Sequence, residues 1–323
     1  MPQSTKHSQP TRIRIDRRSM LKGSAVLATA SVAGVGGSLV GAAPAHAAGM
    51  EAIDDRTHGR MRYVLASTPS IDWNPSVNVL LPDGYDPARR YPVLYLLHGG
   101  GQNFQKFKED DIEGLTAGRD LIVVMPDGGI AGWYSNPVTS NAGMRNWESF
   151  HMDELIPWID ANLSTIPEAG GRAVSGFSMG GFGALKYTAK YYGHFASVSS
   201  HSGPANLRGD WGHVVTDWAN TTSMAELLGG TVYGVPWDEA RVSADNPMER
   251  IESYRGKRIF LVAGTAPLDQ EAVVLATQRE FGGALEAAGI PHERYEEPDG
   301  HFVRRERLQQ DIDGVIDYLI KAG

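Results

Sequence analysis

The sequence contains no cysteine among its 323 residues, and acidic side chains outnumber basic ones. The missing cysteines exclude a disulfide scaffold, a cysteine nucleophile, an iron–sulfur cluster and any zinc site with cysteine ligands. The formal net charge of −8 argues against a nucleic-acid-binding protein, which needs a basic surface. The chain also lacks metal-ligand spacing and a dinucleotide-binding G-x-G-x-x-G motif, so we expect neither a metal nor an organic cofactor.

The N-terminal segment differs from the rest in charge and composition. Residues 1–22 carry a net +5, whereas residues 48–323 carry −13. Arg17-Arg18 precedes a weakly apolar run rich in Gly, Ala and Ser, and Ala45-His46-Ala47 has the small-x-small pattern of a cleavage site. This pattern is typical of a twin-arginine export signal covering residues 1–47, cut after Ala47, and predicts a secreted or cell-envelope protein.

A transmembrane anchor is the alternative for this segment, because the apolar run is about long enough to span a bilayer. Five glycines in that run disfavour a stable helix. No second apolar run of spanning length follows, so we expect no stable membrane span after processing.

Residues 48–323 are predicted to form one α/β domain, because short apolar runs alternate with helical patterns and no repeat or linker divides them. Such alternation indicates a mostly parallel central sheet with helices on both faces. Strands are predicted at 76–81, 91–97, 121–125, 172–175, 195–199, 257–263 and 292–296, and helices at 147–163, 180–191, 271–288 and 303–321.

The segment of about 203–255 has a looser pattern and contains Trp211, Trp218 and Trp237. We interpret it as an insertion crossing the top of the sheet. Its tryptophans either pack as ordinary large core residues or form a lid or pocket over an active site.

A candidate nucleophile lies in Gly176-Phe177-Ser178-Met179-Gly180-Gly181, between a predicted strand and a predicted helix. In that setting G-x-S-x-G is a nucleophile elbow, whose tight turn requires glycine where a side chain would collide with a neighbouring strand or helix. The turn presents the Ser178 hydroxyl at the carboxyl edge of the sheet and at a helix N-terminus, which favours developing negative charge.

A candidate oxyanion hole follows the predicted strand at 91–97. Leu97-His98-Gly99-Gly100-Gly101-Gln102 is a glycine-rich loop that can aim a backbone N–H at a carbonyl oxygen. The candidate donors are the N–H of Gly100 or Gly101 and that of Met179. His98 is interpreted as a structural residue of this loop.

The remaining members of a catalytic triad should follow Ser178 in the order acid, then histidine. His301 follows Pro298-Asp299-Gly300 and is preferred to His292, which opens a short strand. Asp269 is preferred as the acid. Glu271 is the alternative, set second because an acid in the first turn of a helix is a common partner of the helix dipole.

These segments together resemble the esterase family of α/β-hydrolases that groups S-formylglutathione hydrolases, feruloyl and acetylxylan esterases and the antigen 85 mycolyltransferases. The resemblance covers about residues 60–320 and depends on Tyr95–Gly99, Trp133–Ser135, Trp147–Leu163, Gly176–Gly181, Asp245–Pro247, Gly264–Asp269 and Asp299–His301. It implies an α/β-hydrolase fold with Ser178 as nucleophile, Asp269 as acid, His301 as base, and the amides of Gly100 and Met179 as oxyanion donors.

The chain departs from two branches of that family. The mycolyltransferases carry Asp, Arg and Trp at or near His98, Gly101 and Phe302, positions linked there to sugar handling. The S-formylglutathione enzymes are cytosolic, whereas the N-terminus here predicts export. The resemblance therefore favours a secreted carboxylesterase.

We accordingly expect a serine esterase whose partner is a small, lipid or polysaccharide-linked acyl ester and which binds no nucleic acid. An acyltransferase using the same acyl-enzyme is the alternative. A non-catalytic envelope- or carbohydrate-binding protein on the same scaffold is disfavoured by the complete candidate triad. The sequence sets neither the acyl group, nor the alcohol, nor the oligomeric state.

Overall fold

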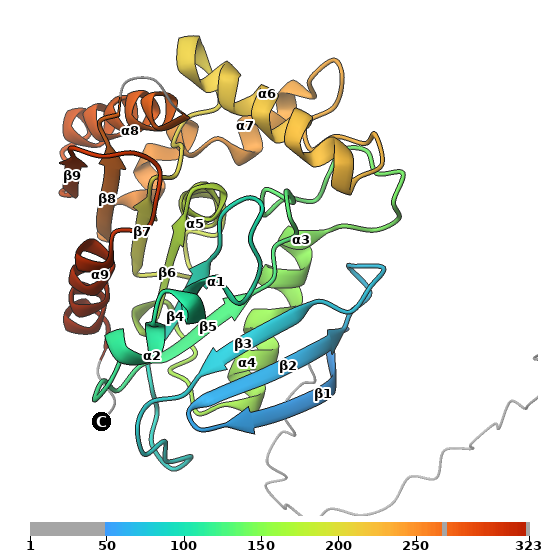
Figure 1. Ribbon diagram of the computed structural model, residues 1–323. Helices are drawn as coiled ribbons and strands as arrows, with labels where there is room; N and C mark the ends of the chain where they lie inside the picture. The colour runs from blue at the N-terminus through green and yellow to red at the C-terminus, as the bar shows by residue number, and fades with distance from the viewer. Residues whose placement is uncertain (1–48, 267–269, 321–323) are drawn as a thin grey trace, which may run out of the picture. The chain divides into compact units, whose positions relative to one another are not determined.

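The computed structural model describes residues 49–266 and 270–320, so the predicted export signal lies outside the described residues. The centre of the described part is a nine-stranded sheet (Figure 1). Its strands are β1 (Glu51–His58), β2 (Met61–Ser67), β3 (Ser76–Leu80), β4 (Val93–Leu97), β5 (Ile122–Pro126), β6 (Arg172–Phe177), β7 (Ser197–His201), β8 (Arg258–Gly264) and β9 (Glu293–Glu297).

The strand order is β1-β2-β3-β5-β4-β6-β7-β8-β9. From β5 to β9 all neighbours are parallel, while β1, β2 and β3 pair antiparallel and β3 joins the sheet antiparallel to β5. The sheet is therefore mostly parallel, as predicted. The carboxyl ends of β4 and β6 meet at one edge because Leu97 pairs with Gly176, and this edge carries the candidate nucleophile and oxyanion loop.

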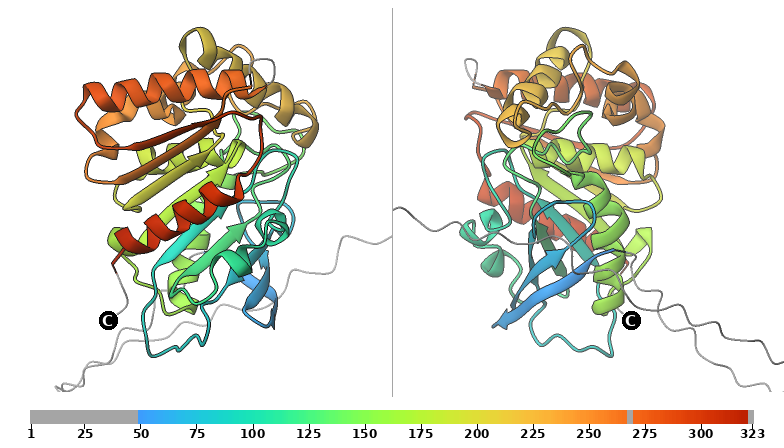
Figure 2. Two further views of the ribbon diagram at one scale, coloured as in Figure 1. Left: turned by 60° about the vertical axis from the view of Figure 1, so that its left-hand side comes forward. Right: turned by 90° about the vertical axis from the view of Figure 1, so that its right-hand side faces the viewer.

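Helices cover both faces of the sheet, as predicted (Figures 1 and 2). They are α1 (Lys106–Glu109), α2 (Ile112–Leu115), α3 (Trp147–Ser149), η1 (Phe150–Leu155), α4 (Ile156–Asn162), η2 (Ala169–Gly171), α5 (Met179–Lys190), α6 (Gly209–Glu226), α7 (Glu239–Asp245), η3 (Pro247–Tyr254), α8 (Gln270–Ala287) and α9 (Arg305–Tyr318).

Alternate residues of the central strands enter two different cores. In β4, Val93, Tyr95 and Leu97 pack in the core that also contains apolar residues of α4, α5 and α8. Leu94 and Leu96 pack in the second core, with apolar residues of α1, α2 and α9. Burial on both faces explains why this strand reads as a continuous apolar run.

The predicted strands and helices from residue 76 onward are confirmed to within a few residues at each end. The long helix predicted at 147–163 is continuous as α3, η1 and α4, with a π-helical segment in its middle. The N-terminal hairpin of β1 and β2 was not predicted. Strand β1 is an edge strand that is almost wholly exposed, and its residues EAIDDRTH give no apolar alternation.

The segment 203–255 forms α6, α7 and η3, and α6 and α7 lie together at the top of Figure 1. Its three tryptophans have different surroundings. Trp237 packs against the main core, Trp218 lines a pocket beside Ser178, and Trp211 is exposed. Core packing thus holds for Trp218 and Trp237, and Trp218 also forms part of a pocket wall.

Buried ionic contacts and hydrogen bonds hold α5, the helix that follows Ser178, against three other segments. The Lys186 Nζ is fully buried and donates to the Tyr134 carbonyl at 2.7 Å, the Glu148 carboxylate at 2.9 Å and the Asp245 carboxylate at 3.3 Å. Burial lowers the pKa of Lys186, and the two carboxylates oppose that change. Removing one partner would leave a buried charge uncompensated, so these contacts hold α5 in one position.

A second buried carboxylate, Asp311 of α9, joins that helix to three neighbouring strands beneath the active-site edge. It accepts hydrogen bonds from Ser175 of β6, Ser199 and His201 of β7, and Arg258 of β8. Burial alone would raise its pKa, but the hydrogen bond and charge of His201, together with Arg258 and Ser199, lower the pKa of Asp311 from 3.8 to about 2.

This shift predicts an acid-dependent loss of stability. Because the folded-state pKa lies below the ordinary value, ionised Asp311 contributes about 2 kcal/mol above pH 3.8, a contribution lost as the pH falls from 3.8 towards 2. Urea unfolding of Asp311→Asn should show lower stability at pH 7 and a flatter decline between pH 4 and pH 2. The exposed Glu306→Gln on the same helix serves as control and should stay close to the parent protein. An equally steep acid limb in Asp311→Asn would contradict this origin.

Candidate active site

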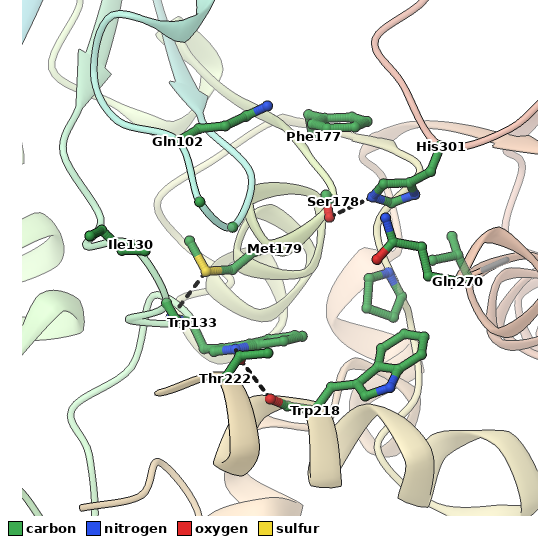
Figure 3. A pocket seen from close by; sticks show the side chains of 15 residues that line it. Gln102, Ile130, Trp133, Phe177, Ser178, Met179, Trp218, Thr222, Gln270 and His301 are labelled. Carbon is green, nitrogen blue, oxygen red and sulfur yellow. Dashed lines mark hydrogen bonds between the residues drawn. The ribbon is translucent and has the colours of Figure 1, made fainter. Parts of the chain in front are cut away.

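Ser178 lies at the sharp turn between β6 and α5, where the motif predicted it. Its backbone has φ 55° and ψ −119°, a conformation that a non-glycine residue adopts only when its surroundings enforce it. The Ser178 N–H donates to the His201 carbonyl of β7 at 2.8 Å, which fixes the turn against the neighbouring strand. The hydroxyl is thereby presented at the mouth of a pocket (Figure 3).

The flanking glycines are required by close backbone packing, as predicted. A Cβ at Gly176 would overlap the backbone of Gly180, and a Cβ at Gly180 would overlap the carbonyl group of Leu97 at the end of β4. The first contact allows the chain to reverse within the turn. The second brings the start of α5 against the strand that leads into the glycine-rich loop.

His301 contacts both Ser178 and a carboxylate. Its Nε2 accepts a hydrogen bond from the Ser178 Oγ at 2.8 Å, and its Nδ1 donates to the Glu271 Oε2 at 2.5 Å (Figure 3 shows the first). Its ring also lies against Phe177, with 5.0 Å between the centroids. The structure therefore brings together a hydroxyl, an imidazole and a carboxylate in the order that nucleophile activation requires.

Among the described residues, the carboxylate that contacts His301 is that of Glu271, the alternative to the preferred Asp269 in the sequence. Asp269 lies outside the described residues, so the contacts give that preference no support. Glu271 lies in the first turn of α8, which begins at Gln270. In the sequence, the first-turn position counted against Glu271. In the structure, this position places its side chain beside the end of β8, where its Oε1 accepts hydrogen bonds from the Gly264 N–H and the Ser202 hydroxyl.

Sequence reasoning missed Arg304, which holds the loop carrying His301. The buried guanidinium donates to the Asp299 carboxylate, to the Gly300 carbonyl at 2.7 Å and to the Phe302 carbonyl at 3.2 Å, so it contacts residues on both sides of His301. It also donates to the Ser202 Oγ at 3.0 Å. A single arginine after the histidine carries no motif, so only the fold reveals this role.

Gly100 and Met179, the residues of the two predicted oxyanion amides, both line the pocket beside Ser178. The Gly101 N–H is engaged, because it donates to the Ile130 carbonyl at 2.7 Å. The Gly100 N–H donates to no acceptor among the described residues. Met179 is the first residue of α5, where a backbone N–H has no partner within the helix. Gly100 and Met179 are therefore the amides available to a ligand.

The other two candidate histidines have structural surroundings. His98 is buried, its Nε2 accepts from the Gly128 N–H at 2.9 Å and its Nδ1 donates to the Gly99 carbonyl at 2.8 Å. Both ring nitrogens are thus used to hold the glycine-rich loop, as interpreted from the sequence. His292 contacts the carbonyl of Ile290 at 3.2 Å and makes no contact with Ser178.

The pocket beside Ser178 has a volume of about 650 Å³. Of the described residues that line it, His301 is the only one with a titratable side chain. The larger uncharged side chains are those of Gln102, Ile130, Trp133, Phe177, Met179, Trp218, Thr222, Gln270 and Val274. Such a pocket fits an uncharged group with a substantial apolar part.

The described residues contain neither a cluster able to bind a metal ion nor a helix able to span a membrane. Residues 49–266 and 270–320 contain no group of three or more His, Asp or Glu side chains placed to hold a metal ion. No helix within these ranges is both long and apolar enough to cross a bilayer.

Comparison with known proteins identifies the family. The family model described as "Putative esterase" matches residues 68–304, which is most of the chain. The chain belongs to this esterase family. Its sequence is 61% identical over 275 residues to Esterase Rv1288 of Mycobacterium tuberculosis, a match covering 81% of this chain and 60% of that protein. The chain thus spans about 60% of the length of this esterase relative.

Solved structures give the fold of this esterase-family chain. Mycobacterium tuberculosis MPT51 superposes with a TM-score of 0.67 at 19% identity, covering 83% of this chain and 100% of MPT51. An S-formylglutathione hydrolase from Agrobacterium tumefaciens superposes with a TM-score of 0.64 at 16% identity, covering 83% and 99%. At these identities the likeness shows the fold alone, and that fold is the α/β-hydrolase fold expected from the sequence.

The contact between Glu271 and His301 yields a test that separates the two candidate acids. Replacing Glu271 by Gln should slow the reaction of Ser178 with a fluorophosphonate about 10³-fold or more, because the imidazole loses the carboxylate that orients it and stabilises its protonated form. Asp269→Asn should react within about threefold of the parent rate, since loss of a residue outside the triad removes no such partner. The rates are measured by labelling kinetics, with thermal melting as a check on folding. The reverse ranking of the two variants would return the acid role to Asp269.

Proposed function

We propose that this chain is a serine carboxylic-ester hydrolase that acts through a covalent acyl-enzyme. The observation that carries the proposal is the hydrogen-bonded series Ser178–His301–Glu271 at the mouth of an uncharged pocket flanked by the Gly100 and Met179 amides. Membership of the esterase family supports the same reaction class.

In the first half of the proposed reaction, the Ser178 Oγ attacks the ester carbonyl carbon while the His301 Nε2 takes the hydroxyl proton. The carbonyl oxygen becomes an oxyanion that accepts hydrogen bonds from the Gly100 and Met179 N–H groups. The carbon–oxygen bond to the alcohol then breaks. His301 returns the proton to the leaving alkoxide, and the acyl group remains on Ser178.

In the second half, water takes the place of the alcohol. His301 removes a proton from the water, whose oxygen attacks the acyl carbon. Collapse of the second tetrahedral intermediate releases a carboxylic acid and returns the proton to Ser178. Throughout, Glu271 holds the Nδ1–H and stabilises the imidazolium that forms at each step.

The pocket indicates the kind of ester. Because its described lining carries no Asp, Glu, Lys or Arg side chain, burying a charged acyl group there would be costly. The indole rings of Trp133 and Trp218 and the side chain of Ile130 offer apolar contact area. We therefore propose an uncharged acyl or alcohol portion with an apolar body as the bound group.

The test is hydrolysis of p-nitrophenyl esters of increasing acyl length. The parent protein should release p-nitrophenol, and Ser178→Ala should lower kcat by about 10³-fold or more, as loss of a triad nucleophile does. Thermal melting checks that the variant is folded. A Ser178→Ala variant with the full activity of the parent would contradict the proposed mechanism.

The acyltransferase alternative is tested in the same assay by adding glycerol or trehalose. Capture of the acyl-enzyme by an added alcohol would give a new ester, detected by mass spectrometry, whereas a hydrolase gives only the free acid. The two activities share the same acyl-enzyme, so Ser178→Ala should abolish either one.

We also propose that residues 1–47 direct export by the twin-arginine route. Support comes from Arg17-Arg18, the weakly apolar run and the Ala45-His46-Ala47 site. N-terminal sequencing of the protein recovered outside the cytoplasm should give Ala48 as the first residue. An uncut N-terminus on cytosolic protein would contradict this.

A further inference from the structure

One face of α6 is directed at the active-site edge. Trp218, Thr222 and Glu226 are spaced four residues apart, so they lie along the same side of the helix. Trp218 and Thr222 line the pocket beside Ser178 (Figure 3). Glu226 does not line it, and is placed one turn further along, against the loop that forms the opposite pocket wall.

The side chain of Glu226 binds the backbone of that loop. Its Oε2 accepts a hydrogen bond from the Ala131 N–H at 2.7 Å, and its Oε1 accepts one from the Trp147 Nε1 at 3.0 Å. A Cβ at Gly129, whose φ is +75°, would overlap both the carboxylate and the Trp147 indole. The loop therefore has glycine at the point where the carboxylate approaches it most closely.

Thr222 makes a parallel contact one turn earlier on α6. Its Oγ1 accepts a hydrogen bond from the Trp133 Nε1 at 2.9 Å and donates to the Trp218 carbonyl at 2.6 Å (Figure 3 shows the second). The pocket loop is thus held to α6 at Ala131 and again at Trp133. Two contacts fix both its position and its orientation.

The same loop contacts Gly101, the residue after Gly100, and the side chain of Met179. The Ile130 carbonyl accepts the Gly101 N–H at 2.7 Å, which orients the glycine-rich loop so that the preceding Gly100 N–H stays available. The Trp133 N–H donates to the Met179 Sδ at 3.4 Å, so the side chain of the second oxyanion residue is held as well. A shift of residues 130–133 would therefore displace the oxyanion donors.

We propose that Glu226 is a positioning residue for the oxyanion hole: by holding Ala131 and Trp147 it fixes the loop that orients Gly101 and Met179. This inference rests on the proposed esterase function, because it concerns the transition state of that reaction. Glu226 acts through the loop and does not touch the substrate.

The electrostatic setting of Glu226 agrees with a positioning role. Burial raises its pKa and the nearby Asp127 adds to the rise, while the Ala131 N–H, the Trp147 indole N–H and Arg145 lower it. A raised pKa means that the folded protein accommodates the ionised carboxylate less favourably than water does, so ionised Glu226 lowers stability. The ionised form, however, offers both oxygens as acceptors to the two N–H groups.

The experiment compares Glu226→Gln with Asp217→Asn, an exposed acid on the same helix that serves as the matched control. Gln keeps the size of the side chain but replaces one acceptor oxygen by an NH₂ group that cannot accept. Each protein is titrated with a fluorophosphonate to count active sites, and kcat and KM for a p-nitrophenyl ester are then expressed per active site.

We expect Glu226→Gln to lower kcat about tenfold with KM changed less than about threefold, because displacing an oxyanion donor costs less than the 10²–10³-fold that follows its removal. Affinity for a trifluoromethyl ketone, whose bound form places an oxyanion in the hole, should fall by a similar factor to kcat/KM. Asp217→Asn should match the parent in all three quantities.

Glu226→Asp guards against a folding defect in the first variant. It keeps the charge but shortens the side chain by one methylene, so it cannot reach both N–H groups, and kcat per active site should again fall. If kcat per active site in both variants stays within about twofold of Asp217→Asn, the inference is overturned, whatever happens to thermal stability. Failure of the esterase proposal itself is distinguishable, since the parent protein would then release no p-nitrophenol, or Ser178→Ala would keep the parent's activity.

Discussion

The close approach of α5 to the end of β4 sets the geometry of the active-site edge. No side chain fits between Gly180 and the Leu97 carbonyl group, so the two backbones touch. Leu97 ends β4 and leads directly into the glycine-rich loop, while Gly180 lies two residues after Ser178. This backbone contact therefore brings Ser178 and the glycine-rich loop to one pocket.

The unfavourable backbone conformation of Ser178 is maintained by buried polar contacts on several sides. Lys186 ties α5 to the Tyr134 carbonyl, Glu148 and Asp245, and Asp311 joins α9 to the strands beneath the turn. Buried charges of this kind add little net stability but are costly to break singly. They leave the backbone around Ser178 with one favourable conformation. This suits a site whose hydrogen-bond donors must be in place before the reaction.

Much of the fold was predictable because its signals are local. Strands buried on both faces read as apolar runs, and the tight turn at Ser178 demands glycines at fixed spacing. The hairpin of β1 and β2 was missed for the opposite reason: β1 is an exposed edge strand with a charged sequence, and only its pairing with β2 makes it a strand. The contacts of Arg304 and Glu226 join segments far apart in the chain and leave no local pattern.

The choice between Asp269 and Glu271 shows where sequence reasoning reached its limit. Both acids follow β8 within a few residues, and local rules favoured the loop position over the first helical turn. The contact to His301 depends on where α8 begins relative to the end of β8 and on how the loop carrying His301 folds back under Arg304. Neither is encoded within a short stretch of residues.

The sequence by itself determined the α/β architecture and placed Ser178 at a tight turn and His301 beside it near the C-terminus, because each follows from a short motif beside a buried strand. The tertiary structure alone decided that Glu271 meets His301 and that α6 holds the loop of residues 130–133. Those contacts are set by side chains from separate segments meeting at one edge of the sheet, and only the folded chain brings them within hydrogen-bonding distance.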